Sequence, residues 1–274
     1  MLELHHFPFS TCSQKVRLVL AEKGLDFVSH EVDILSGAQH DPAYVKLNPN
    51  RVVPTLVHDG RVLIESTLIN QYLDEAFADP PLQPADAFGR HQARLWTRRL
   101  DDKVHPATAV VTFAVGPRNF VLQQPADVRE ANLAAIPDPV ERAARRSVIE
   151  HGVEAPEFTI ALGRMIGLLD QMEAALAARP QGWLGGPTYG LADAAVLPYV
   201  LRLDHLGFAA LVTAPARPAV ADWYARSCAR TSFATAVAAW IPDGVIELMR
   251  AGGAAAWPKV EEAAALIATR PHAA

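Results

Sequence analysis

The chain has 274 residues, of which half are hydrophobic and a fifth are charged, and its net charge is −5. This length and composition predict a folded soluble protein of one or two domains and exclude a disordered chain. The net negative charge argues against a protein that binds nucleic acid. No stretch reaches the roughly 18 apolar residues that a membrane span requires.

The first eighty residues alternate short strands and helices. Hydroxyl residues and Gly mark helix ends, and Asp59-Gly60 is a preferred turn of a two-residue β-hairpin. The last helix of this part is expected to place Leu68, Ile69, Tyr72 and Leu73 on one face. The expected elements are a strand over 1–6, a helix over 10–23, a strand over 27–34, a short helix over 41–47, a hairpin over 54–64 and a helix from residue 66.

The rest of the chain is predicted to be helical. The proline-rich run 79–84 is typical of an interdomain linker. A long helix over 88–114, kinked at Pro106, is expected next, followed by a weakly periodic insertion over 116–137. Asp138-Pro139, with Glu141 following, is a favourable helix start. Further helices are expected over 157–178, 191–206 and 219–227, with a weak tail past Trp240.

Four segments of the sequence resemble the cytosolic glutathione transferases. The resemblance implies a thioredoxin-like α/β N-terminal domain over 1–80, an all-α C-terminal domain over 86–245, and a C-terminal extension over 246–274. It also implies a homodimer, with glutathione as the co-substrate. The matching segments are Phe9-Ser-Thr-Cys-Ser-Gln-Lys-Val-Arg-Leu-Val-Leu-Ala-Glu-Lys-Gly24, Leu47-Asn-Pro-Asn-Arg-Val-Val-Pro-Thr-Leu56, Glu65-Ser-Thr-Leu-Ile69 and Trp183-Leu-Gly-Gly-Pro-Thr-Tyr-Gly-Leu-Ala-Asp193.

Ser10 stands between the first strand and the N-terminus of the next helix. Lowering the pKa of a thiol by two units from about 8.5 needs about 2.7 kcal/mol. A helix N-terminus supplies about 0.3–1 kcal/mol, and a donated hydroxyl hydrogen bond about 1.5–3 kcal/mol. The two together are sufficient for Ser10 to hold a bound thiol as its thiolate. The alternative is that Ser10 only caps the helix.

Cys12 is the competing catalytic residue. A cysteine in the first turn of a helix has a lowered pKa and can form a mixed disulfide with glutathione, although it can also be an inert buried side chain. The resemblance places the catalytic group at Ser10 in serine- and omega-like enzymes and at Cys12 in beta-like enzymes. The run from Ser10 to Ser13 is also similar to the zeta class, in which the first serine of the run is the catalytic one. We expect Ser10 to be the thiolate donor and Cys12 to be accessory.

The resemblance assigns the residues that hold glutathione. It implies a cis bond between Val53 and Pro54, which leaves the Val53 backbone free to pair with the cysteinyl part of the tripeptide; the alternative is a proline that simply opens a strand. Glu65 and Ser66 would bind the γ-glutamyl end of glutathione. The Glu65 side chain would bind its ammonium group, and the helix start at Ser66 would bind its carboxylate. His40 would bind the glycyl carboxylate, or else be a solvated loop histidine.

Other residues are weaker candidates for the site. Arg51 is a second candidate for the glycyl carboxylate, and Phe9 and His105 are expected to line the acceptor-substrate pocket. Asp193 matches the family, but Gly190 stands where a hydroxyl residue usually completes a capping box, so the reciprocal hydrogen bond is expected to be lost.

No metal site is predicted. His5 and His6 are neighbours on a strand, so they point to opposite faces of the sheet and cannot chelate an ion together. No group of His, Cys, Asp and Glu has the spacing of a metal site.

The sequence predicts an enzyme that adds or exchanges the glutathione thiolate on a hydrophobic electrophile. The run 38–49, the Asp59-Gly60 hairpin and the run 136–139 look like bacterial β-etherase-type relatives, which implies an aromatic ether or a related compound as acceptor. The alternatives are a zeta-like glutathione-dependent cis–trans isomerase and a non-catalytic scaffold or ligand-binding protein. The two cysteines and the lack of a signal-peptide pattern favour a reducing, cytoplasmic location.

Overall fold

The computed structural model describes residues 1–213 and 215–269, so part of the expected C-terminal extension, 270–274, lies outside the described residues. The described chain divides into two compact units. The first unit consists of Met1–Arg98, Ala175–Pro198 and Ala221–Pro242. The second unit consists of Arg99–Ala174, Tyr199–Val220 and the described chain from Asp243 onward.

The first unit is organised by a four-stranded mixed sheet with the strand order β2-β1-β3-β4. Strand β1 pairs in parallel with β2 and antiparallel with β3, and β3 pairs antiparallel with β4. Asp59 and Gly60 both have positive φ, as a tight two-residue hairpin requires. The elements are β1 (Leu2–His6), α1 (Thr11–Glu22), β2 (Val28–Glu31), η1 (Ala38–His40), α2 (Pro42–Leu47), β3 (Thr55–His58), β4 (Arg61–Leu63) and α3 (Ser66–Ala76).

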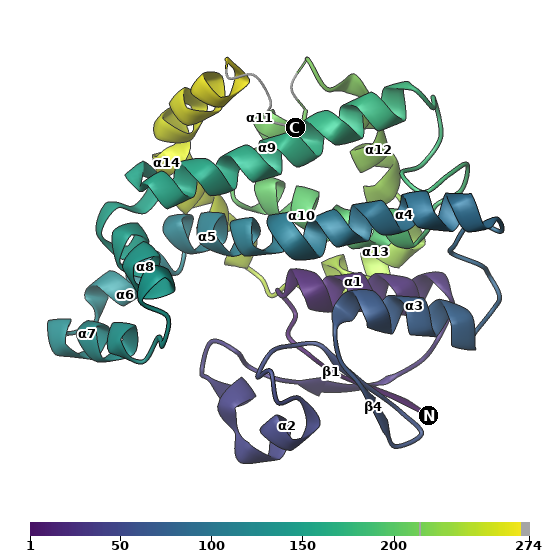
Figure 1. Ribbon diagram of the computed structural model, residues 1–274, viewed down its shortest axis with the longest axis horizontal. Coiled ribbons are helices and arrows are strands. Elements are labelled where there is room, and N and C mark those ends of the chain that lie inside the picture. Colours follow the sequence, from purple (N-terminus) through teal and green to yellow (C-terminus); the bar gives the residue numbers. More distant parts are fainter. Residues whose placement is uncertain (214, 270–274) are drawn as a thin grey trace. The chain divides into compact units, whose positions relative to one another are not determined.

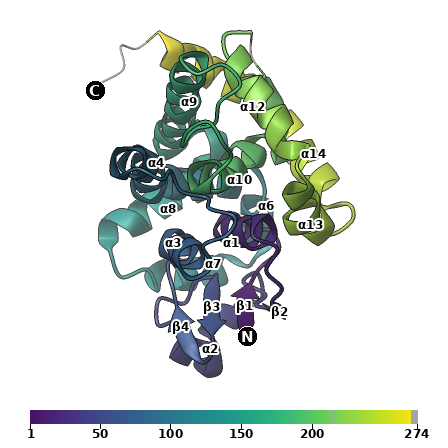
Figure 2. The same ribbon diagram turned by 90° about the vertical axis from the view of Figure 1, so that its right-hand side faces the viewer.

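Helices α1 and α3 lie side by side over one face of this sheet, and α2 lies on the other face (Figures 1 and 2). The buried side of α3 is centred on Ser66, Ile69, Asn70 and Leu73. The prediction that Leu68 shares this face is wrong, because its side chain is 58% exposed. Asn70 takes a buried position instead, since its amide donates to the Lys15 carbonyl of α1.

The remaining elements are helical, which confirms the predicted fold class. No single helix in the described part of the chain has both the length and the apolar character of a membrane span; one pair of consecutive segments, Thr231–Trp240 and Val245–Ala268, reaches both only when counted together. The elements are α4 (Ala87–Arg99), η2 (Leu100–Val104), α5 (His105–Val115), α6 (Arg118–Gln123), α7 (Ala126–Ala134), α8 (Pro139–His151), η3 (Gly152–Glu154), α9 (Pro156–Ala177), α10 (Leu191–His205), α11 (Ala209–Val212), α12 (Pro218–Cys228), α13 (Thr231–Ala236), η4 (Ala238–Trp240) and α14 (Val245–Ala268).

The helix predicted over 88–114 is interrupted by a π-helical turn. Helix α4 passes into this turn, η2, which passes directly into α5. The backbone N–H of His105 bonds to the carbonyl of Leu100, five residues earlier. Pro106 follows at once and has no N–H to donate, so the usual bond to the residue four positions earlier is absent there. The expected kink is therefore a local change of helical pitch just before Pro106.

The tail past Trp240 is not weak, since it forms the 24-residue helix α14. Gly252, Gly253 and Pro258 weaken the helical signal of the sequence. The structure shows why Gly253 stands there: a Cβ atom on Gly253 would lie 1.5 Å from the carbonyl oxygen of Leu206. Within the second unit, the glycine allows α14 to approach the end of α10.

Asp193 is the buried hydrogen-bond centre at the start of α10. One carboxylate oxygen accepts from the Leu184 N–H at 2.9 Å and the Trp223 indole N–H at 2.8 Å, and the other accepts from the Gly190 N–H at 3.1 Å. Half of the capping box is therefore kept without a hydroxyl. Burial raises the pKa of Asp193 to about 6, although the three donors oppose that change.

Gly190 is close to the linker that precedes α4. The N–H of Leu191 donates to the carbonyl of Leu82 at 2.9 Å. A Cβ atom on Gly190 would lie 2.4 Å from the same carbonyl oxygen. The missing hydroxyl residue is thus explained by the close approach of two backbone segments.

We expect Gly253→Ala to destabilise the protein, because its new methyl group overlaps the Leu206 carbonyl. The loss should be at least about 1–3 kcal/mol in the free energy of unfolding, measured by chemical denaturation. Gly167→Ala in α9 is the matched control, since its Cβ atom meets nothing within 4 Å. The control should be stabilising by about 0.5–1 kcal/mol. Equal effects in the two variants would contradict the proposed contact.

We expect the ionisation of Asp193 to destabilise the folded state. Because its pKa is higher in the folded than in the unfolded chain, the folded state binds this proton more tightly. Its contribution to stability is therefore fully present below about pH 4 and is lost as the pH rises through about 6. The free energy of unfolding of the wild type, relative to Asp193→Asn, should fall by up to about 3 kcal/mol over that interval. A difference that grows with pH would show that the hydrogen bonds outweigh the burial.

Candidate active site

Two serines build the turn between β1 and α1. Ser10 is the N-cap residue of α1, and its Oγ accepts a hydrogen bond from the backbone N–H of Ser13 at 3.2 Å. Ser13 is buried, and its Oγ accepts from the backbone N–H of Phe7 at 3.3 Å. The N–H of Ser10 donates to the Phe7 carbonyl at 3.1 Å. These bonds hold residues 7–10 in a defined conformation at the helix start.

The hydroxyl of Ser10 is half-buried and keeps its proton available. A serine hydroxyl has two lone pairs and one proton, and the cap uses one lone pair. Among the residues that the structure describes, none accepts that proton. Capping and donation to a bound thiolate therefore do not exclude each other, and the positive end of the 12-residue α1 lies at the same point.

Cys12 lies in the same turn as Ser10. It is the second residue of α1, half-buried and not in a disulfide. The hydroxyl of Ser10 thus sits at the cap, while the thiol of Cys12 sits on the helix itself. Both candidates occupy the first turn, as the sequence predicts.

The segment before β3 offers a free backbone edge. The Val53–Pro54 bond is cis, the isomer that the family resemblance implies. The preceding carbonyl, of Val52, accepts from the Tyr44 hydroxyl at 2.6 Å and the Asn48 amide at 2.8 Å, which fixes the chain there. In the described chain, no hydrogen bond to the backbone N–H or carbonyl of Val53 is found. Val53 can therefore pair with an extended peptide.

The start of α3 combines an anion site with a carboxylate. Glu65 has a φ of 69°, a region that costs a non-glycine residue roughly 1–3 kcal/mol. Its carboxylate accepts from the Asn50 amide at 3.1 Å. Ser66, which follows, is buried, and no side chain at the N-cap position bonds the first N–H groups of the helix. These groups are available to a carboxylate ligand.

Three contacts show that these parts adjoin one another within the first unit. Because His5 faces Thr55 in the antiparallel pairing, the segment before β3 lies beside the turn after β1. Val53 accordingly packs in one hydrophobic cluster with Phe7. The Lys15 ammonium donates to Thr67 Oγ1 at 2.9 Å, so the first turns of α1 and α3 are neighbours.

The two candidates for the glycyl carboxylate are both exposed. His40 ends η1, and its Nε2 lies 3.2 Å from the Gln39 amide nitrogen. Arg51 lies between Asn50 and the Val53 segment and has a φ of 57°. Ala38, two residues before His40, packs against the cluster that contains Val53. His40 therefore belongs to the same neighbourhood as the free backbone edge.

Phe9 and His105 belong to different units. Phe9 is half-buried in the turn before Ser10. His105 is the first residue of α5 in the second unit, where its Nδ1 lies 3.3 Å from the Tyr199 hydroxyl. The ring of His105 is exposed and perpendicular to that of Tyr199. It stays a candidate for the acceptor pocket on the basis of the resemblance.

Arg17, which no motif of the sequence indicates, positions the Ser10 turn from behind. Its side chain is buried, and it donates to the Pro8 carbonyl and to His6 Nδ1, each at 2.9 Å. Burial lowers the pKa of Arg17 to about 9 and, with the adjacent guanidinium, lowers that of His6 to about 3, so His6 is neutral. The available signal is one arginine within the apolar run 16–20.

His5 and His6 face opposite sides of the sheet, as predicted. His6 contacts α1 through Arg17, whereas the ring of His5 lies on the side of Tyr44 in α2. Burial and the neighbouring His30 lower the pKa of His5. The sheet also brings His5 close to His30 and Glu3, a grouping that spacing along the chain does not reveal.

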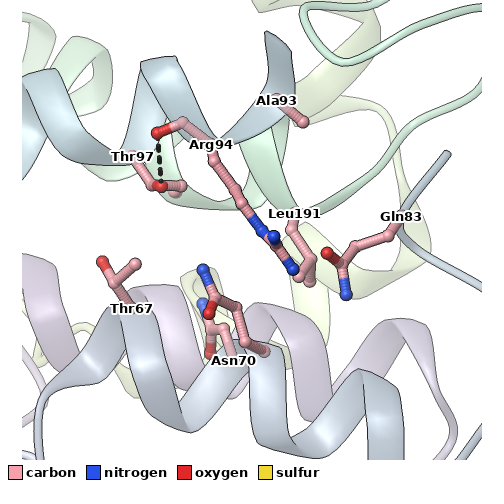
Figure 3. Close-up of a pocket in the computed structure, with 9 residues that line it drawn as sticks. Thr67, Asn70, Gln83, Ala93, Arg94, Thr97 and Leu191 are labelled. Carbon is pink, nitrogen blue, oxygen red and sulfur yellow. Dashed lines mark hydrogen bonds between the residues drawn. The ribbon is translucent and has the colours of Figure 1, made fainter. Parts of the chain in front are cut away.

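A small pocket between α3 and α4 is not the site. It is lined by polar side chains that include Thr67, Asn70, Gln83 and Arg94 (Figure 3). Its volume is about 10 Å³, which is room for about one water molecule. A tripeptide needs a far larger cleft. The candidate site is therefore the open strip of surface, here called the edge, that Ser10, Val53 and Glu65 form.

The chain matches two family models. Residues 4–81 match the model described as "Glutathione S-transferase, N-terminal domain", and residues 129–226 match "Glutathione S-transferase, C-terminal domain".

Individual relatives agree with these models. Protein LigF of Sphingobium sp. strain SYK-6 is 38% identical over 117 residues, which are 42% of this chain and 46% of LigF. The crystal structure of LigF, a beta-etherase, matches this chain with a TM-score of 0.75 and 28% identity, and the match covers 86% of this chain and 98% of that one.

Two further relatives are matched over most of their length. The tetrachloro-p-hydroquinone reductive dehalogenase of Sphingobium chlorophenolicum is 30% identical, and the alignment covers 86% of this chain and 95% of the relative. The structure of a zeta-class maleyl pyruvate isomerase shares the fold with a TM-score of 0.67 at 23% identity, and covers 88% of this chain and 99% of that one.

Proposed function

This chain belongs to the glutathione S-transferase family, and on that premise we propose that Ser10 activates the thiol of bound glutathione for transfer to a hydrophobic electrophile. It is a glutathione transferase, and glutathione is its co-substrate. The observation that carries the proposed role of Ser10 is its hydroxyl, which caps α1 as an acceptor and keeps its proton for a ligand.

Ser10 acts as a hydrogen-bond donor and not as a base. Its proton points to the sulfur, which has given its own proton to solvent, and the N-terminus of α1 favours the negative charge. Together the two effects lower the thiol pKa by about two units. The thiolate then attacks an electrophilic carbon of the acceptor, forms the carbon–sulfur bond, and the displaced electron pair leaves with the acceptor's leaving group.

We propose that the rest of the edge holds the tripeptide. The free N–H and carbonyl of Val53, next to Pro54, pair with the cysteinyl residue. The γ-glutamyl carboxylate lies at the uncapped N–H groups near Ser66, and its ammonium group lies at Glu65. The unusual backbone of Glu65 supports this role, because strained residues cluster at ligand sites. His40, with Arg51 as alternative, binds the glycyl carboxylate.

The acceptor is proposed to be an aromatic ether or a related compound. The likeness to the beta-etherase LigF supports this choice, and Phe9 beside Ser10 offers an aromatic wall. His105 would add a polar group to the acceptor pocket. A zeta-like glutathione-dependent isomerase is the second candidate, and the likeness to maleyl pyruvate isomerase supports it. Product analysis separates the two, since an ether is cleaved to a thioether and a phenol, whereas an isomerase returns glutathione unchanged.

Three further proposals complete this assignment. The glutathione-binding domain spans 1–80 and the substrate-binding domain 86–245, with 246–274 as an extension; the matched ranges 4–81 and 129–226 support these boundaries. The protein is a homodimer, as is typical of the family. Its location is cytoplasmic, which Cys12 and Cys228 support because neither is in a disulfide.

We expect Ser10→Ala to raise the pKa of bound glutathione and to lower kcat/KM at neutral pH by about 10–100-fold, since about 1.5–3 kcal/mol of thiolate stabilisation is lost. The loss of the cap should also destabilise the fold by about 1 kcal/mol. Ser10→Thr keeps both the hydroxyl and the cap and should retain most activity. The thiolate is followed by ultraviolet absorbance of the protein–glutathione complex.

Cys12→Ala is the matched variant in the same turn, and it should leave conjugation nearly unchanged. If Cys12→Ala abolishes activity while Ser10→Ala keeps it, the protein is a cysteine-type thiol transferase. If neither variant alters the thiolate and the wild type is not retained on immobilised glutathione, the scaffold alternative holds.

We expect Glu65→Gln to weaken glutathione binding by about 10–100-fold, because a charge-assisted bond to the ammonium group is worth about 1.5–3 kcal/mol. The pKa of the bound thiol should not change, since Glu65 contacts the other end of the tripeptide. The control is Glu75→Gln, an exposed position of the same helix, which should bind as the wild type does. Calorimetric titration with glutathione measures both, and equal affinities would remove Glu65 from the site.

A further inference from the structure

A second group of polar side chains gathers on the sheet face that carries α2. In β1 the residues Leu2, Leu4 and His6 are buried toward α1, so Glu3 and His5 point to the opposite face. In the neighbouring parallel strand β2, His30 stands directly beside His5. The three side chains of Glu3, His5 and His30 therefore share one face at the edge of the sheet.

Their geometry is compact. The imidazole rings of His5 and His30 are stacked, with centroids 4.5 Å apart and an interplanar angle of 15°. The Nε2 atom of His30 lies 3.0 Å from Glu3 Oε2. One ligand atom from each residue can be chosen so that all three lie within 4.8 Å of one another. Within the described chain, no other set of three His, Cys, Asp or Glu residues meets this condition.

This donor set has a clear chemical preference. Two imidazole nitrogens and one carboxylate oxygen suit Zn²⁺ and other first-row divalent cations, at bond lengths of about 2.0–2.2 Å. Small rotations about the side-chain bonds bring three atoms at this separation around one ion. All three side chains are half-buried, so they are held by the sheet and still open to solvent. Solvent can fill the remaining coordination positions.

We propose that Glu3, His5 and His30 form a binding site for a first-row divalent cation, with Zn²⁺ as the reference ion. The site is separate from the proposed glutathione edge, because none of its residues takes part there. It joins β1 to β2, an edge strand of only four residues. A bound ion would cross-link the two strands and stabilise the sheet at the strand that leads to Ser10.

The test uses the full chain, stripped of metal with a chelator and then dialysed. Zn²⁺ binding is measured by calorimetry, and Co²⁺ is added separately because its visible absorption bands report coordination by the protein. We expect one equivalent of either ion to bind per chain. Bound Zn²⁺ should also raise the Tm of the stripped protein, since it binds the folded state.

Variants decide whether these residues hold the ion. His30→Ala and Glu3→Gln should each weaken Zn²⁺ binding by at least about tenfold and weaken the Co²⁺ bands. His91→Ala, an exposed histidine on α4, is the matched control and should bind as the wild type does. The Tm of each variant without metal shows whether it folds, and two single variants keep the test valid if one fails.

Three results would overturn the proposal. One is the absence of saturable binding at one ion per chain in the folded wild type, which would leave the three residues as a hydrogen-bonded group only. The other is an unchanged affinity in both His30→Ala and Glu3→Gln. Loss of binding in His91→Ala to the same extent would also overturn it, because the ion would then lie elsewhere.

Discussion

The turn that carries Ser10 depends on a buried cation. The guanidinium of Arg17 donates to the Pro8 carbonyl, to His6 and, at 2.7 Å, to the carbonyl of Ala236, and it lies 5.1 Å from the ring centre of Trp240. It thereby joins the end of β1, the interior of α1 and the segment around η4. Removing it would leave several buried acceptors unpaired, each at a cost of about 1–3 kcal/mol. Two sets of hydrogen bonds therefore fix the turn that carries Ser10: those from the Arg17 side chain and those made by Ser13.

In this arrangement, the residues that hold the turn in place differ from the residues that would contact a ligand. The buried side chains of Arg17 and Ser13 bond to other parts of the protein, whereas Ser10, Val53 and Glu65 lie where they can offer polar groups to a ligand. The supporting bonds run between elements that are adjacent in the sheet or packed upon it. A ligand at this edge consequently meets groups that are already oriented, which reduces the entropy lost on binding.

Local signals in the sequence predict much of this structure. The caps at Ser10 and Asp138 and the turn at Asp59-Gly60 are recognisable because each depends on a few neighbouring residues. The contacts between distant segments are not: Arg17 meets Ala236, and His5 meets His30, only through tertiary pairing. Helix α14 is missed because Gly253 lowers helical propensity, while the close backbone that requires it lies elsewhere in the chain. The family resemblance predicts the residues of the candidate site, but only the folded structure shows that the Ser10 hydroxyl caps α1 as an acceptor and keeps its proton.

The backbone contact at Gly190 sets a limit on engineering by family consensus. The family resemblance implies a hydroxyl residue at this position, and replacing an unusual residue by the one expected in a family is a standard route to higher stability. Here any side chain would have to displace the carbonyl of Leu82, whose hydrogen bond to Leu191 ties the linker to α10. In this chain, a side chain at position 190 and the close approach of the linker are therefore alternatives. Introducing a hydroxyl residue at Gly190 would therefore displace the linker and is not expected to stabilise this protein.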